Sequence, residues 1–327
     1  MGMEAQYAVR INQVLDYMDS HINQPMELAD FAEIANLSKF HFHRVFSETF
    51  GLSAVKYLQR LRLERSVKNL IYNPSFSIGE IADRCGFSTA GNFCRAFRNY
   101  FGLSARELRA MFDYRDIQNF HDIANRRLKG HLLAKRFDLS VFDGYRPKEI
   151  CKDLGEEMYS TLHSFERLSF ERRSSADLVY CRHFGPMDLG SVESRAFGLW
   201  FWVGSMAERF PDEHFFKVGM SPDRPEFTPA AYRRFDLGVL VANKVPHDCA
   251  FNRREVPGGL WAIFPVMAEP AKHRGIWRLL MSEWLPRVPW EQDDRQLMTL
   301  YSLKVDCNKE GKKEHLFCLP IRPAGQF

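Results

Sequence analysis

Arginine recurs at matching places in two similar stretches of this 327-residue chain, LSKFHFHRVFSETFG at 37–51 and FSTAGNFCRAFRNYFG at 87–102. Arg44 in the first stretch and Arg95 in the second each have a phenylalanine two residues before and two residues after them. An exposed guanidinium can bond to the O6 and N7 atoms of guanine, and an exposed ring can pack on a thymine methyl group. The chemistry open to these stretches is therefore recognition rather than bond breaking.

Other residue patterns argue against catalysis and metal binding. His41 and His43 are two residues apart, so on a helix their side chains point away from one another and make a poor metal pair. The sequence contains no Ser-His-Asp elbow, no His-Glu-x-x-His motif and no phosphate-binding loop. Its 7 cysteines are scattered and include no Cys-x-x-Cys pair. We expect no metal site, no cofactor and no enzymatic activity.

Each arginine-bearing stretch is predicted to be the second helix of a helix, a tight turn and a helix. In the first copy, LADFAEIA (28–35) has one apolar face, and Ser38 is a favourable N-cap for the helix that contains Phe42. In the second copy, residues 78–85 form the first helix, GFS forms the turn, and Phe93 lies in the second helix. The pattern therefore predicts one helical unit used twice.

The two copies differ by one residue in their turns. Phe50 matches Phe101 at an offset of 51, whereas Ser38 matches Ser88 at an offset of 50.

Between the copies, VKYLQRLRLERSVKNLIYN (55–73) has an apolar side, many basic residues and no Pro or Gly, so it predicts one continuous helix. Two helix-turn-helix units held about 34 Å apart can enter successive major grooves of DNA. A plain helical bundle is the competing interpretation.

From Val14 to Arg109 the sequence resembles the DNA-binding domain of the AraC/XylS family of bacterial-type transcription regulators. The resemblance is carried by the stretch at 37–51, by IGEIADRCGFSTAGNFCRAFRNYFGLSARELR (78–109) and by the connecting helix. It implies an all-α domain of seven helices over residues 1–112. The second helix of each pair would read double-stranded DNA.

The resemblance also implies which side chains of the first copy contact DNA. Phe40, His43 and Arg44 match positions that face base edges in the family, and Lys39 is exposed beside them. Arg44 would bond to guanine, and Phe40 would contact a thymine methyl group. We expect this copy to specify the DNA sequence.

The second copy offers fewer long side chains. Ala90 and Gly91 stand where the family often carries longer polar residues, so base recognition should depend mainly on Arg95, with Thr89 and Asn92. We expect this copy mainly to hold phosphates. Candidate contacts to the DNA backbone are Lys56, Arg60, Arg62, Arg98, Arg106 and Arg109.

Length and composition agree with a two-domain DNA-binding protein. The chain is too long for one ordinary domain, and its formal net charge of +4 permits nucleic acid as a partner. The start, MGMEAQYAVRINQVL, lacks the features of a signal peptide, and apolar stretches such as LGVLVA are too short to span a membrane. We expect a cytoplasmic protein.

The second half has a different pattern. Residues 113–164 are predicted to be a connector with some helix. From about 165 to 323, strands alternate with two amphipathic helices, at about 188–210 and 270–286, which predicts a pseudo-symmetric α+β domain. Its strand patterns include DLVYCRHFG, FDLGVLVA and LMTLYSLKV.

This half resembles the GyrI-like effector-binding domain, in which two strand-helix-strand-strand modules surround a cleft. The segments that carry the resemblance are GMSPDRPEFTPAAYRRFDLGVLV (219–241), VPGGLWAIFPV (256–266), and IWRLLMSEWLP with the following PWE (276–291). A DNA-binding domain followed by such a module is the arrangement of Rob-like regulators. The resemblance implies a cleft that binds lipophilic molecules, often cations, between aromatic side chains and a buried glutamate.

Thr299 stands where the family usually has that glutamate, two residues before Tyr301. A hydroxyl cannot neutralise a buried cation, so a neutral or differently held ligand is expected. Candidate cleft residues are Trp200, Trp202, Phe216, Trp261, Phe264, Trp284, Thr299 and Tyr301, with Glu283 as a substitute carboxylate. Trp200 and Trp202 are two apart on a helix, so at most one of them faces a cleft.

These observations predict a DNA-binding transcription regulator whose C-terminal domain senses a small lipophilic or aromatic molecule. Expected partners are double-stranded DNA, RNA polymerase and the effector, and the chain would act as a monomer or a weak dimer. Alternatively, the C-terminal domain binds another protein, or, less in keeping with Thr299, acts as a hydrolase. Activation and repression are both compatible with this interpretation.

Overall fold

The structure is a computed structural model that describes residues 3–111, 147–186, 189–223, 228–241, 251–301 and 313–324. The chain divides into two compact units, the first mainly within Met1–Asp113 and the second containing the described residues from Pro147 onward, except for 251–252. Most of the predicted connector, and the stretch SLKV after Tyr301, lie outside the described residues.

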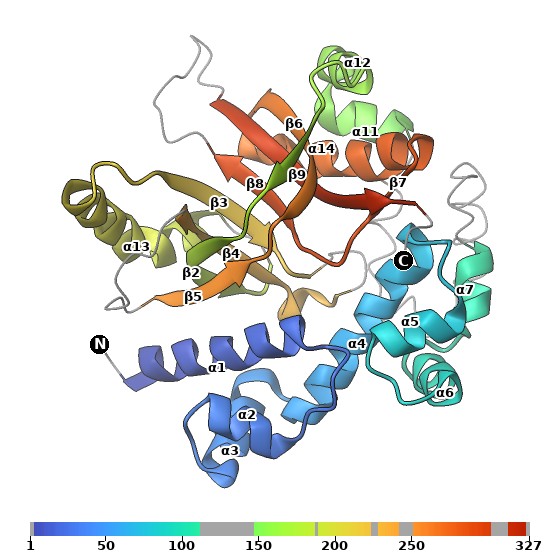
Figure 1. Ribbon diagram of the computed structural model, residues 1–327, viewed down its shortest axis with the longest axis vertical. Helices are drawn as coiled ribbons and strands as arrows, with labels where there is room; N and C mark the ends of the chain where they lie inside the picture. The colour runs from blue at the N-terminus through green and yellow to red at the C-terminus, as the bar shows by residue number, and fades with distance from the viewer. Residues whose placement is uncertain are drawn as a thin grey trace. The chain divides into compact units, whose positions relative to one another are not determined.

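The first unit is helical (Figure 1). Seven helices occur among its described residues, the number that the AraC/XylS resemblance implies. They are α1 (Met3–Ser20), α2 (Leu28–Ile34), α3 (Lys39–Phe50), α4 (Ala54–Tyr72), α5 (Ile78–Arg84), α6 (Ala90–Phe101) and α7 (Ala105–Met111).

The two predicted copies have the same aromatic packing. The ring centroids of Phe42 and Phe46 on α3 are 5.4 Å apart, and those of Phe93 and Phe97 on α6 are also 5.4 Å apart. All four side chains are fully buried. Burying a phenylalanine contributes about 1.5–3 kcal/mol, so this stripe holds each helix pair together.

Helix α4 connects the copies and packs against α2, α3, α5 and α6. It begins after Ser53, whose Oγ accepts a hydrogen bond from the backbone N of Lys56 at 3.4 Å. Arg62 Nε donates to Ile22 O at 2.9 Å and its Nη2 donates to Gln24 O at 2.6 Å. Arg62 therefore fastens α4 to the segment after α1 instead of extending toward a DNA backbone.

The second unit contains an antiparallel sheet. Its described strands are β1 (Ser169–Arg173), β2 (Ala176–Phe184), β3 (Phe215–Ser221), β4 (Arg234–Val241), β5 (Asn252–Val256), β6 (Gly259–Ala268), β7 (Trp290–Gln292), β8 (Leu297–Tyr301) and β9 (Lys313–Pro323). The strand order is β1-β6-β9-β8-β3-β4-β2-β5, and β7 pairs with β9. Across the central β8–β3 pair, the order β6-β9-β8 mirrors β2-β4-β3. The predicted alternation of strands and helices is thus present, while β1 and β7 were not predicted.

Four α-helices accompany this sheet in the described residues: α11 (Pro147–Leu154), α12 (Glu156–His163), α13 (Leu189–Arg209) and α14 (His273–Leu279). Helix α14 continues as a π-helical turn, η3 (Leu280–Trp284), and a 3-10 turn, η4 (Leu285–Arg287), where one α-helix was predicted. Short 3-10 turns also occur at η1 (Ala230–Tyr232) and η2 (Pro270–Lys272). Helix α11 lies in the predicted connector and packs against α14.

Helices α13 and α14 pack against the same face of the sheet, called here the helix-covered face. Val192 and Ala196 of α13 pack with Leu237, and Trp277 of α14 packs with Phe317 at 5.3 Å between ring centroids. The strand register places Leu237, Thr299 and Phe317 on this face. The opposite face carries a second core cluster that includes Tyr180, Val218, Trp261, Met298 and Cys318.

Candidate nucleic-acid interface

The turn between α2 and α3 aims the first candidate reading helix. Asn36 has a left-handed backbone with φ of 50°, and the backbone N of Leu37 donates to Ala32 O at 2.9 Å. Ser38 caps α3 because its Oγ accepts from His41 N at 3.3 Å, as predicted. Gly51, with φ of 66°, ends the helix in the left-handed conformation that glycine adopts without strain.

The second copy repeats this geometry. Gly86 has φ of 74°, and Phe87 N donates to Ala82 O at 2.9 Å. The N-cap of α6 is Thr89, whose Oγ1 accepts from Asn92 N at 3.1 Å. The predicted match of Ser38 with Ser88 is therefore wrong for the cap: Thr89 takes that role, and Ser88 is the additional turn residue.

Lys39, Phe40, His43 and Arg44 are all exposed on α3, as expected of side chains that face a partner. Phe40 is 82% exposed, which is unusual for so large an apolar side chain. Arg44 Nη1 lies 4.0 Å from Glu48 Oε1, and both side chains are mostly exposed, so the pair is too weak to hold the guanidinium. Together the four side chains combine two cations, an aromatic ring and an imidazole on one short helix.

His41 is excluded from this surface by its packing. It is half-buried and meets the ring of Tyr7 edge-on, with 5.4 Å between centroids. His43 is exposed, so the two histidines have different environments.

The matching surface of α6 is smaller. Positions 90, 91, 94 and 95 carry Ala, Gly, Cys and Arg where α3 has Lys, Phe, His and Arg. Arg95 Nη2 donates to Asn92 Oδ1 at 3.5 Å, and Asn92 Nδ2 donates to Ser88 Oγ at 2.9 Å. Thr89, Asn92, Arg95 and Arg98 are exposed. The polar groups of α6 are thus partly engaged with one another.

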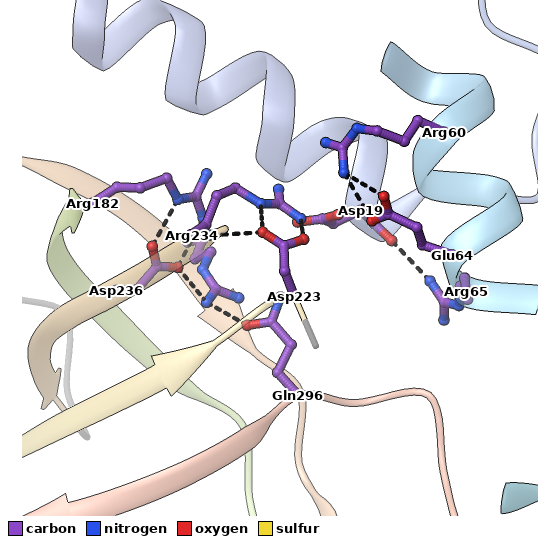
Figure 2. Close-up of polar contacts among 10 residues, drawn as sticks. Asp19, Arg60, Glu64, Arg65, Arg182, Asp223, Arg234, Asp236 and Gln296 are labelled. Atoms are coloured by element: carbon purple, nitrogen blue, oxygen red, sulfur yellow. Dashed lines mark hydrogen bonds and ion pairs between the residues drawn. The ribbon is translucent and has the colours of Figure 1, made fainter. Parts of the chain in front are cut away.

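Arg60 differs from the other candidates for DNA contact. Its Nη1 donates to both carboxylate oxygens of Glu64, one turn along α4, at 2.8 Å each, and both side chains are buried (Figure 2). Its guanidinium also lies over the ring of Tyr57 at 4.3 Å. Arg60 therefore has a structural environment and does not present its charge for a phosphate contact.

The candidate ligand residues of the second unit are not gathered at one place. Phe264, Thr299 and Tyr301 are on the helix-covered face, since Phe264 and Thr299 both pair with Phe317 across β9. Trp261 lies on the opposite face, in the core cluster, with Arg295 stacked over its ring at 4.5 Å. The strand alternation therefore separates Trp261 from the others.

Trp200 and Tyr301 share a lysine. Lys217 Nζ is 4.6 Å from the ring centroid of Trp200 and 5.7 Å from that of Tyr301. It is also 2.9 Å from Glu193 Oε1, and Trp200 Nε1 donates to Glu193 Oε2 at 3.1 Å. Burial, with a smaller effect from the charge of Glu193, raises the pKa of Tyr301. Sequence analysis missed Lys217 and Glu193, because only the strand register brings position 217 beside 301.

Two histidines complete this part of the helix-covered face. His273 Nε2 is 2.8 Å from His315 Nδ1, and the rings of both lie near Tyr301, with centroids 5.8 and 5.1 Å away. Burial, followed by the neighbouring His315, lowers the pKa of His273 to about 4. His273 is therefore neutral at physiological pH.

Glu283 and Trp284 have other neighbours. Glu283 is buried in the π-helical turn and pairs with Arg287, while His163 Nε2 lies 3.7 Å from its Oε2. Trp284 packs toward Phe170, with 6.2 Å between ring centroids. Glu283 is thus already paired with a cation, which makes it an unsuitable substitute for the glutamate of the family.

Buried ion pairs fix the opposite face of the sheet (Figure 2). Arg182 on β2 makes two hydrogen bonds with Asp236 on β4, at 2.7 and 2.8 Å, and Arg254 Nη2 lies 3.0 Å from the same carboxylate. Arg234 pairs with Asp223 at 2.7 and 2.8 Å. Burial alone would raise the pKa of Asp236, but the arginines outweigh it and the pKa is lowered. Both carboxylates therefore have structural partners, and Asp236 stays ionised.

Within the described ranges, no three His, Cys, Asp or Glu side chains gather closely enough to hold a metal ion. No helix among the same residues is long and apolar enough to cross a membrane.

Comparison with known proteins places the N-terminal helices in a known class. Residues 31–111 match the model of a helix-turn-helix domain. The Msm operon regulatory protein of Streptococcus mutans is 35% identical over 109 residues, which are 33% of this chain and 37% of that protein. The HTH-type transcriptional activator RhaS of an Enterobacter species is 33% identical over 100 residues, 31% of this chain and 36% of that protein.

An AraC-type transcriptional regulator structure from Chromobacterium violaceum has 31% identity and a TM-score of 0.30, and the match covers 32% of this chain and 92% of that one. The chain spans little more than a third of the length of the two curated relatives. The similarity to them is therefore a similarity of one domain.

Proposed function

We propose that this chain, in which residues 31–111 form an AraC-type helix-turn-helix domain, is a sequence-specific DNA-binding transcription regulator. The observation that carries the proposal is the outward surface of α3. Lys39, Phe40, His43 and Arg44 are exposed there, on a helix fixed by caps at Ser38 and Gly51. An exposed phenylalanine between cations is costly in water but suits a major groove that offers thymine methyl groups.

In this proposal α3 and α6 enter successive major grooves and do different work. Arg44 bonds to a guanine edge, Phe40 packs on a thymine methyl group, and His43 and Lys39 bond to a base and a phosphate. On α6, Arg95 supplies the main base contact, while Thr89, Asn92 and Arg98 hold the backbone. Arg60 takes no part, because Glu64 occupies its guanidinium. The bound chain would act on transcription through a contact with RNA polymerase.

The test is selection of bound sequences from random duplex DNA. The wild type is compared with Arg44→Ala and Arg95→Ala, and with Arg209→Ala, an exposed arginine of the second unit, as the matched control. We expect an asymmetric motif that Arg44→Ala largely loses, that Arg95→Ala weakens, and that Arg209→Ala leaves unchanged. The absence of any enriched motif at low salt, where backbone contacts are strongest, would refute the proposal.

For the second unit we propose a GyrI-like effector domain that binds a neutral aromatic molecule. The mirrored strand orders and the two helices on one face support this assignment. Lys217 already places a cation between Trp200 and Tyr301, with Glu193 as its counter-charge, so a cationic ligand would find this place taken. A flat neutral ring could instead stack beside the same aromatic side chains.

Ligand choice is testable by tryptophan fluorescence. Titration with 1-naphthol, a neutral aromatic probe, and with tetraphenylphosphonium, a lipophilic cation, would be performed on the wild type and on Lys217→Met. We expect the neutral probe to bind the wild type and the cation to bind only after Lys217 is replaced. Binding of the cation by the wild type, or of neither probe by either protein, contradicts the proposed ligand class.

A further inference from the structure

The outward side of α13 is apolar to a degree that is uncommon for an exposed helix. Phe197 is 75% exposed and Phe201 is 80% exposed, one turn apart on the same side of the helix. The other residues on this side of the helix are Ser194, Gly198, Gly204, Ser205 and Glu208, of which only Glu208 is charged and the rest are small. Together with the two phenylalanines, these five residues are called the α13 stripe. Surface helices normally carry charged residues here, so the stripe marks an interaction surface.

The core of the second unit does not account for this stripe. Helix α13 packs on its own sheet through Val192 and Ala196, which contact Leu237, and its Leu199 and Met206 are also buried. These residues lie on the side of the helix opposite Phe201. The two phenylalanines are therefore additional to what the fold requires.

We propose that a second copy of this chain covers the α13 stripe, with the two α13 helices antiparallel about a two-fold axis at Phe201. The argument is that the stripe is complementary to itself. When helices pack, a side chain of one enters a hole formed by residues i, i+3, i+4 and i+7 of the other. Phe201, Gly204, Ser205 and Glu208 have this spacing.

The large and small residues are placed to fit in this pairing. Phe197 lies four residues before the axis. In the antiparallel pair it therefore lies opposite Gly204 and Ser205 of the other copy, which are three and four residues after the axis. These small residues leave space in the middle of the hole for an aromatic ring. By two-fold symmetry the second Phe197 enters the hole of the first copy, as an isologous interface requires.

The single charge of the stripe selects the antiparallel direction. In a parallel pair the two Glu208 carboxylates would lie side by side and repel each other. In the antiparallel pair each Glu208 lies opposite Ser194 of the other copy, and the two carboxylates are about 21 Å apart along the axis.

The size of the stripe predicts a weak dimer. Positions 194–208 extend over about 21 Å of helix, so the buried area falls below the roughly 800 Å² per partner of a standard stable interface. A dissociation constant in the micromolar range is therefore expected. Two copies that meet at neighbouring DNA sites would associate through this surface, whereas dilute copies would remain apart.

Sedimentation equilibrium of the full chain without DNA, from about 1 to about 100 μM, tests the proposal over the range of such a constant. The decisive variant is Gly204→Leu, which fills the hole. A Cβ at Gly204 meets no atom within 4 Å, and the residue lies within a helix, so the variant should fold. Phe197→Ser removes the inserted ring. The matched control is Phe216→Ser, which changes a 50% exposed phenylalanine on β3, outside the stripe.

We expect the wild type to form a concentration-dependent dimer. Gly204→Leu and Phe197→Ser should each raise its dissociation constant by about tenfold or more, whereas Phe216→Ser should leave it unchanged. A wild type that stays monomeric at the highest concentration overturns the proposal. A dimer whose dissociation constant is unchanged by Gly204→Leu also overturns it. Association would then not depend on insertion of the Phe197 ring into the hole at Gly204. Failure of DNA binding does not affect this outcome, since the measurement contains no DNA.

Discussion

The two helix-turn-helix units have the same interior and different exteriors. Their phenylalanine pairs have equal spacing, and each turn has a left-handed residue, Asn36 or Gly86, followed by an equivalent backbone hydrogen bond. Their outward positions carry Lys39, Phe40, His43 and Arg44 in one unit and Ala90, Gly91, Cys94 and Arg95 in the other. Packing therefore constrains both copies equally, while the surface that meets a partner has been free to diverge. Only the arginine is retained in both.

The largest effect should show that the interiors are equivalent. Phe46→Ala and Phe97→Ala each remove a fully buried ring and leave a cavity, so each should lower the free energy of unfolding by about 3–5 kcal/mol. Denaturant unfolding of both variants measures this. Losses that differ by more than about 2 kcal/mol would contradict the equivalence of the two cores.

The next largest effect should be a difference between the exposed surfaces of α3 and α6 in DNA binding. Arg44→Ala should weaken binding to the selected site by about 1–3 kcal/mol and remove the preference at one base pair. Arg95→Ala should weaken binding by less than Arg44→Ala, more evenly across sequences, with a salt dependence lower by about one unit of slope. Titrations at several salt concentrations separate the two cases. Equal loss of sequence preference in both variants would mean that the copies read DNA alike.

Transplanting the first surface onto the second should sharpen the comparison. The double change Ala90→Lys and Gly91→Phe gives α6 the side chains of Lys39 and Phe40. A Cβ at Gly91 meets only Thr89 Oγ1, at 3.9 Å, so the site has room. We expect a new preference for thymine in the second half of the motif, worth about 1 kcal/mol. The same selection experiment detects it, with Gly91→Ala as the control for helix stability.

The smallest effect concerns that control itself. Gly91→Ala should raise the free energy of unfolding by about 0.5–1 kcal/mol, because glycine is disfavoured within helices. It adds one methyl group and no hydrogen-bonding group, so the selected motif should keep its hydrogen-bonded base preferences. A shift of the motif would show that the backbone at position 91 takes part in recognition.

Local patterns were sufficient to predict the first unit. Helical spacing of phenylalanines, the cap at Ser38 and the repeat itself predicted the helices and their buried sides. The cap at Thr89 was missed because the extra residue could be placed on either side of Ser88. Arg60 was assigned to DNA although Glu64 follows it by one turn, the spacing of an ion pair on one helix, which could have been noticed.

The second unit could be predicted less well, because its site residues are brought together by strand pairing. Trp261 and Phe264 are three apart on one strand and so lie on opposite faces, which contradicts the prediction that both line one cleft. The position of Lys217 beside Tyr301 depends on a register between β3 and β8, strands far apart in the chain. No local pattern encodes that register. The same is true of the π-helical turn that carries Glu283.

The continuity of α4 has a consequence for affinity. Its 19 residues contain no proline or glycine and span about 28 Å. The position of α6 is therefore fixed once α3 has bound DNA. Binding of α6 then becomes an intramolecular step with a high effective concentration of DNA. Helix α6, even if it is too weak to bind DNA by itself, can in this way still lengthen the residence time of the whole chain on its DNA site.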